Sequence, residues 1–83
     1  MSLTLQPVRV ANGHDEEGVL AFFEERLVAV LVHLSEENEI APGDWFLEAG
    51  FGRLDGVEHP TFSDLEAAQD WLAKRLGPAP AQP

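Results

Sequence analysis

Residues 18–34 read GVLAFFEERLVAVLVHL and form the densest apolar stretch of the chain, so the rest of the fold must pack on them. As a helix, this stretch would place apolar side chains at spacings of three and four, but Val28, Ala29 and Val32 would then face outward, and valine favours strands. As strands, residues 19–23 and 27–34 would form a hairpin with Glu24, Glu25 and Arg26 as its polar break. We favour the hairpin, although its turn lacks the glycine typical of such connections.

Two further segments have the composition of strands. Residues 4–10 are partly apolar, and Pro7 suits an edge strand because it cannot donate a hydrogen bond to a neighbour. Residues 44–51 alternate, which is typical of a strand with one buried face. The two faces of that segment carry Trp45, Leu47, Ala49 and Phe51 on one side and Phe46, Glu48 and Gly50 on the other.

A helix is predicted near the C-terminus. Ser63 is a suitable N-cap, and Glu66 three residues later completes a capping box. Gly77 and Pro78 end the helix in the usual order. Its apolar face consists of Leu65, Ala68, Leu72 and Leu76. The tail, residues 77–83, is rich in proline and alanine and is predicted to be disordered.

These elements predict a single α+β domain over residues 1–76, with an antiparallel sheet of three or four strands and one C-terminal helix packed on one face. The chain has 83 residues and no cysteine. A domain of this size often needs a disulfide, a metal or a partner subunit for stability. Because disulfides and cysteine-bound metals are excluded, a partner subunit is the remaining means.

The sheet also predicts an interface. Both faces of the strand at residues 27–34 are apolar, yet one helix can cover only one of them. An uncovered apolar face usually marks an interface, and a symmetric homodimer that packs sheet on sheet is the simplest arrangement. Alternatively, the N-terminal segment could fold over that face. The interface residues that the alternation predicts are Leu27, Ala29, Leu31, His33, Phe46 and Glu48.

The net charge of the chain limits the kinds of partner that it is expected to bind. Five Lys and Arg residues against fifteen Asp and Glu residues give a net charge of -10. Nucleic acids and anionic membranes attract clusters of basic residues, and the few in this chain are scattered. Residues 1–7 lack the features of a signal peptide, and the longest apolar run is far shorter than the roughly 20 residues of a membrane helix. We therefore expect a cytoplasmic protein that binds neither nucleic acid nor membrane.

No pattern predicts catalysis, a cofactor or a metal. The tripeptide Gly50-Phe51-Gly52 is similar to the start of a dinucleotide-binding fingerprint, but Asp55 replaces its third glycine and no helix follows directly. We interpret these glycines as a bulge or a sharp exit from a strand. His14, His33 and His59 are the candidate bases or ligands; the chain has no cysteine and no HExxH pattern, and no local sequence pattern pairs one of these histidines with a nucleophile.

Three segments of the chain resemble a family of small uncharacterised bacterial proteins. They are residues 25–32 (ERLVAVLV), residues 43–52 (GDWFLEAGFG) and residues 59–72 (HPTFSDLEAAQDWL). The resemblance covers residues 8–76 and supports the hairpin, since the family often has a Gly-containing turn at the position of Glu24 and Glu25. It implies no activity, and no functional residue is transferred from it.

The sequence therefore predicts a non-enzymatic interaction module that acts as a homodimer. One alternative is an acidic inhibitor or nucleic-acid mimic that covers the basic surface of a protein partner. It requires carboxylates gathered on one face, with Glu16, Glu17, Glu24, Glu25, Glu36 and Glu37 as the expected set. A second alternative is a small enzyme in which a histidine lies within hydrogen-bond reach of a carboxylate in a concave pocket.

Overall fold

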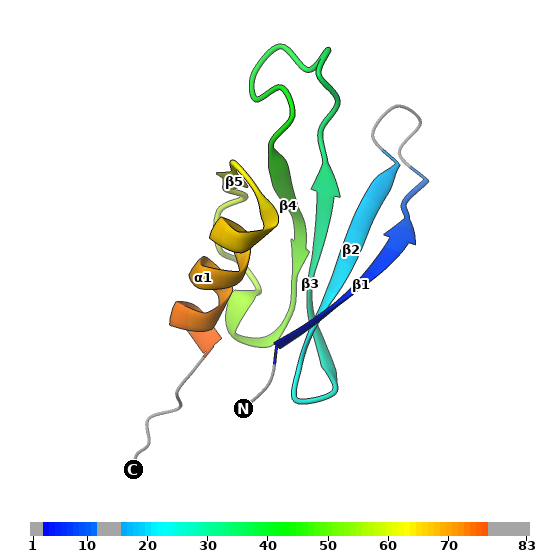
Figure 1. Ribbon diagram of the computed structural model, residues 1–83. Coiled ribbons are helices and arrows are strands. Elements are labelled where there is room, and N and C mark those ends of the chain that lie inside the picture. The colour runs from blue at the N-terminus through cyan, green and yellow to red at the C-terminus, as the bar shows by residue number, and fades with distance from the viewer. Residues whose placement is uncertain (1–2, 12–15, 77–83) are drawn as a thin grey trace.

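The computed structural model describes residues 3–11 and 16–76 and has an open antiparallel sheet with one helix on it (Figure 1). Its five strands lie side by side in chain order. The α+β class with a single C-terminal helix is confirmed. The elements are β1 (Leu3–Arg9), β2 (Glu17–Phe23), β3 (Arg26–His33), β4 (Trp45–Gly50), a 3₁₀ helix (Gly52–Leu54), β5 (Thr61–Phe62) and α1 (Leu65–Leu76).

The sheet has one strand more than the largest number predicted. The added strand, β5, has two residues and pairs with the first two residues of β4. Such a short strand leaves no alternation to detect in a sequence. At the other edge, β1 pairs with β2 along its whole length, and Pro7 lies opposite Val19. The edge position predicted for Pro7 is therefore confirmed, and the N-terminal segment extends the sheet instead of folding over its second face.

The apolar stretch of residues 18–34 forms a hairpin, as predicted, and the helical alternative is wrong. Phe23 pairs with Arg26, so Glu24 and Glu25 alone make the turn. Their φ angles are 54° and 73°, which is the left-handed region that a two-residue type I′ turn requires at both positions. Asparagine and glycine usually occupy these positions because other side chains are strained there. The cross-strand pairs between β2 and β3 thus hold the turn against its local preference.

Replacing the turn by Glu24→Asn with Glu25→Gly is expected to stabilise the protein. Relief of the left-handed strain should raise the free energy of unfolding by about 1–2 kcal/mol, or the melting temperature by about 4–8 °C or more for a domain of this size. Urea and thermal unfolding would measure both quantities.

The matched control for this prediction is Glu24→Gln with Glu25→Gln, which removes both charges but keeps side chains at positive φ. It should gain little of the stability if strain is the cause. Equal stabilisation by the two double variants would attribute the effect to charge repulsion between the glutamates and would contradict the backbone explanation.

The core lies between α1 and one face of the sheet. Paired residues point to the same side, and the pairs Val19–Leu31 and Leu31–Leu47 place three buried side chains in one row, in the same cluster as the buried residues of α1. Ala68, Leu72 and Leu76 are the buried residues of α1. The cluster is completed by Ala21, Val28, Ala29, Trp45, Leu54 and Phe62. We call this side of the sheet the helix face.

The cap of α1 differs from the prediction by one residue. The helix begins at Leu65, and the Ala67 backbone N–H donates to the Asp64 carboxylate at 2.8 Å. Asp64 is therefore the N-cap, in place of Ser63, and Glu66 lies one position too early to complete a capping box. Both serine and aspartate are good caps, so composition alone does not distinguish adjacent candidates.

Two irregularities in strand pairing make the observed register differ from the one that strict alternation predicts. The pairing shifts between Ala21 and Phe22 in β2 and between Val30 and Leu31 in β3. At the second shift, Val30 pairs with Ala49 and Leu31 pairs with Leu47, so Glu48 is an extra residue in β4. A bulge of this kind changes which side chains share a face.

The chain leaves β4 through a tight contact. A Cβ atom added at Gly50 would lie 2.5 Å from the Leu54 carbonyl oxygen and 2.8 Å from the Leu54 Cβ. The 3₁₀ helix thus folds directly against the end of the strand, and Leu54 is buried. The interpretation of these glycines as a sharp strand exit is confirmed. This contact also places Phe51 and Arg53 near the end of the β2–β3 hairpin.

Candidate functional site

The side of the sheet opposite α1 carries an apolar surface, which we call the open face. It consists of three rows of paired residues: Thr4, Phe22 and Leu27; Gln6, Leu20, Val30 and Ala49; and Val8, Gly18, Val32, Phe46 and Thr61. Leu20, Phe22, Val30 and Phe46 are half-buried, and Leu27 is 38% exposed, whereas Gly18 and Val32 of the third row are buried and offer no surface to a partner. At the rim, the His59 ring stacks on Phe46 with a centroid distance of 5.7 Å.

None of the twelve residues in these rows is charged, although the chain carries twenty charged residues. One charged strand residue, Glu48, is exposed at the bulge of β4, beside Ala49 of the middle row. Arg9 and Glu17 pair with each other at the end of the β1–β2 ladder, and Arg26 pairs with Phe23 of the helix face. Twelve paired residues without a charge, bordered by Glu48, have the composition of the centre and rim of an interface.

The six predicted interface residues do not share one face, which corrects that prediction. His33 pairs with Trp45 and Leu31 with Leu47, so both lie on the helix face. Leu31 and Ala29 have no exposed surface at all and belong to the core. The remaining three are found outside the core: Leu27 and Phe46 on the open face, and Glu48 exposed at the bulge of β4.

Sequence reasoning missed most of the open face. Leu20, Phe22, Val30, Val32 and Ala49 form its middle, and only Leu27 and Phe46 were predicted. The available signal was the alternation within each strand. That signal does not show which face of one strand matches which face of the next, and the two bulges remove any simple rule for matching them.

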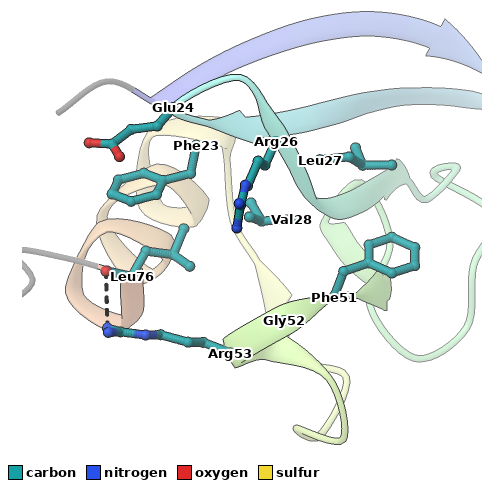
Figure 2. Close-up of a pocket in the computed structure, with 9 residues that line it drawn as sticks. All are labelled: Phe23, Glu24, Arg26, Leu27, Val28, Phe51, Gly52, Arg53 and Leu76. Atoms are coloured by element: carbon teal, nitrogen blue, oxygen red, sulfur yellow. Dashed lines mark hydrogen bonds between the residues drawn. The ribbon is translucent and has the colours of Figure 1, made fainter.

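A second feature is a hollow of about 630 Å³ at the turn end of the β2–β3 hairpin. Three parts of the chain line it: the hairpin turn, the segment that leaves β4, and the last residue of α1 (Figure 2). Its lining residues are Phe23, Glu24, Arg26, Leu27, Val28, Phe51, Gly52, Arg53 and Leu76. We call it the arginine hollow, because Arg26 and Arg53 both line it.

The two arginines of the hollow are held differently. Arg53 Nη1 donates to the Leu76 carbonyl oxygen at 3.2 Å, which places a cation at the negative end of α1. Among residues 3–11 and 16–76, the Arg26 guanidinium has no ion-pair, hydrogen-bond or ring partner. Figure 2 shows the Arg26 side chain pointing from β3 into the space between Phe23 and Phe51, whereas the Glu24 carboxylate points away from it.

The other cations of the helix and of β1 have different neighbours. Arg9 forms an ion pair with Glu16, and the Arg75 guanidinium lies 4.6 Å from the centre of the Trp71 ring. Trp71 and Arg75 also line a smaller hollow of about 500 Å³ with residues 56–58 and Pro60. That hollow has one cation, which already stacks on an aromatic ring.

Two histidines are fixed by contacts within the fold. His33 stacks on Trp45 at 4.4 Å, and its ring nitrogens lie 3.1 Å from Glu17 Oε1 and 3.2 Å from the Gly43 carbonyl oxygen. His59 Nδ1 donates to the Leu47 carbonyl oxygen at 2.7 Å. His33 thus meets a carboxylate, as the small-enzyme alternative requires, but lines neither of the two hollows. His14 lies outside the described residues.

The predicted acidic set divides between the two ends of the sheet. Glu24 and Glu25 form the turn before β3, whereas Glu36 and Glu37 belong to the loop after it. The eight residues of β3 separate the two pairs by about 25 Å. Between residues 35 and 43 the loop is held by its own hydrogen bonds, including two to the Asn38 side-chain oxygen. Glu17 lies at the same end as Glu36 and Glu37, because it contacts His33, the last residue of β3, and Glu16 precedes it in the chain. Four of the six carboxylates therefore lie at one end of the sheet and two at the other, so the complete set does not converge on one surface.

Several kinds of site are not found in the described part of the chain. Over residues 3–11 and 16–76, no three His, Cys, Asp or Glu residues are grouped so that they could hold a metal ion. The one α-helix of these residues is too short and too polar to cross a membrane. Comparison of the chain with protein-family models, curated proteins and solved structures found no match. Membership of the bacterial family therefore stays a prediction.

Proposed function

We propose that this chain is a cytoplasmic, non-enzymatic interaction module that acts as a homodimer, with the open face as its interface. The observation that carries the proposal is the uncharged, apolar composition of that face. Each subunit has a formal charge of -10, so two copies repel wherever their acidic surfaces approach. The paired rows of the open face contain no carboxylate, so two copies can meet there with Glu48, at the bulge beside Ala49, as the nearest acidic strand residue.

The sheet geometry supports a second copy as the occupant. A twofold axis through the open face would pack two sheets face to face and bury the same residues on both subunits. Leu20, Phe22 and Val30 would then be shielded on the side that α1 does not cover. This arrangement also supplies the added core that a chain without disulfides lacks at this size.

The size of the face sets the expected strength of the dimer. Four strands and three rows of side chains cover on the order of 400 Å² per subunit. A standard stable interface buries about 800 Å² per subunit, so we expect a reversible dimer with a dissociation constant of about 1–100 µM.

The solution mass, measured by sedimentation equilibrium between micromolar and millimolar protein concentrations, tests the proposal. The account predicts a rise from monomer to dimer mass. Added salt should strengthen the dimer, because it screens the repulsion between the two acidic subunits and leaves the apolar contact intact. A monomer mass throughout the range, or a dimer that dissociates when salt is added, would contradict the proposal.

A further inference from the structure

We propose that the arginine hollow binds a small apolar monocarboxylate, with its carboxylate on Arg26 and its apolar body against the surrounding side chains. This site is separate from the dimer proposed above, since the hollow lies at the hairpin turn and shares only Leu27 with the open face. Its test is therefore independent of whether the chain dimerises.

The hollow contains two cationic side chains that can bind a carboxylate. Two of the five basic residues of the chain line this one hollow. Arg53 is anchored by its bond to the Leu76 carbonyl, which leaves most of its N–H donors unused by that contact. Arg26 points into the hollow and has no partner among residues 3–11 and 16–76. A guanidinium matches the two oxygens of a carboxylate in a bidentate pair.

The hollow is also lined by apolar side chains that can contact the body of such a ligand. Phe23 and Phe51 lie on either side of Arg26 in Figure 2, and Phe51 is 44% exposed. Leu27, Val28 and Leu76 add aliphatic surface. A volume of about 630 Å³ lies within the range of about 300–1,000 Å³ found for small-molecule sites. An anion with an apolar body would use both the arginine and these side chains.

The charge of the whole chain favours a monoanion. A dianion such as a phosphate group would be repelled more strongly by a protein of net charge -10. A carboxylate with an aliphatic or aromatic body carries only one charge to neutralise. Such a group occurs in a free small acid and at the C-terminus of a peptide that ends in an apolar residue, and the experiment distinguishes these two sources.

The experiment is a titration of ¹⁵N-labelled full-length protein, followed by the chemical shifts of its backbone amides. The probes are 4-phenylbutyrate, its neutral amide, acetate, inorganic phosphate, and a short peptide ending in Leu with either a free or an amidated C-terminus. Arg26→Gln tests the proposed carboxylate partner. Lys74→Gln is the matched control, because it removes the charge of an exposed helix residue that does not line the hollow.

The proposal expects 4-phenylbutyrate to shift the amides of the hollow with a dissociation constant of about 1 mM, as is usual for a ligand of this size. Arg26→Gln and the neutral amide should each weaken binding by about tenfold or more, because each removes the charged pair. Lys74→Gln should change binding by less than about twofold. Acetate should bind more weakly than 4-phenylbutyrate, because it lacks the apolar body.

The peptide identifies the source of the ligand. Binding of the free-acid peptide about tenfold tighter than 4-phenylbutyrate, and lost on amidation, supports the proposal with a peptide C-terminus as the source. Weaker peptide binding supports it with a free acid. The proposal is overturned if the probes cause no shift at about 50 mM, if phosphate binds more tightly than 4-phenylbutyrate, or if Arg26→Gln leaves binding unchanged while the variant keeps its native spectrum.

Discussion

Leu31→Ala is expected to lower the free energy of unfolding by about 2–5 kcal/mol, the largest loss of stability that we predict for one substitution. Leu31 lies in the central strand, between Val19 and Leu47, and has no exposed surface. Truncation there removes buried methyl groups and leaves a cavity between the sheet and α1. A domain of this size has a total stability of about 4–11 kcal/mol, so the variant should unfold at much lower urea concentrations.

Two further variants test whether the loss of stability comes from the burial of Leu31. Leu31→Val should cost about 1 kcal/mol and stay measurable if the alanine variant does not fold. Leu27→Ala removes a leucine that is 38% exposed, and it should cost less than about 1 kcal/mol in the monomer. Equal losses for Leu27→Ala and Leu31→Ala, measured at a concentration where the chain is monomeric, would contradict the division of the sheet into a helix face and an open face.

Val30→Glu is expected to weaken the proposed dimer by about a hundredfold or more. Val30 lies in the middle row of the open face, between Leu20 and Ala49. In a face-to-face dimer the new carboxylate would be buried without a partner, and two subunits would each contribute one. A penalty of about 3 kcal/mol for an unpaired polar group corresponds to a factor of about one hundred in the dissociation constant.

Sedimentation equilibrium of Val30→Glu at concentrations where the unmodified chain is dimeric would measure this loss. Ala73→Glu is the matched control, because it adds the same charge at an exposed position of α1. It should leave the dimer nearly unchanged. A Val30→Glu variant that keeps its fold and the same dissociation constant would exclude the open face as the interface.

The parts of the fold that sequence predicted are those set by local patterns. The two dense apolar runs on either side of Glu24 and Glu25 indicated a hairpin, and the structure has its turn at these two residues. The apolar spacing of α1 and its Gly-Pro boundary indicated one C-terminal helix. Pro7 marked an edge strand because of its missing N–H group. Each of these depends on residues close together in the chain.

The parts that sequence did not predict depend on how distant segments meet. Alternation along β3 divides its side chains into two sets, but only the pairing of His33 with Trp45 shows that Leu31 belongs with Leu47. The register shifts near Val30 and Phe22 then decide which residues face the solvent side. Alternation alone therefore assigns Ala29 and Leu31 to an interface, whereas the pairing places both in the core.

The arginine hollow also depends on how distant segments of the chain meet. Arg26, Arg53 and Leu76 come from three segments far apart in the chain, and nothing in the neighbourhood of any one of them indicates the others. The scatter of the basic residues along the sequence argues against a nucleic-acid or membrane partner, but it does not show which of them meet in the fold. Only the fold brings the two arginines to one hollow, because the 3₁₀ helix packs against Gly50 and places Arg53 beside the end of α1.

The most direct test of the proposed dimer is an isotope-filtered nuclear Overhauser experiment on a mixture of ¹³C-labelled and unlabelled protein at millimolar concentration. It detects only contacts between subunits. The account predicts intermolecular signals among the side chains of Leu20, Phe22, Val30 and Phe46, and none to Leu72 in the core. Intermolecular signals confined to α1 or to the loop after β3, or a dimer without signals from the open face, would contradict it.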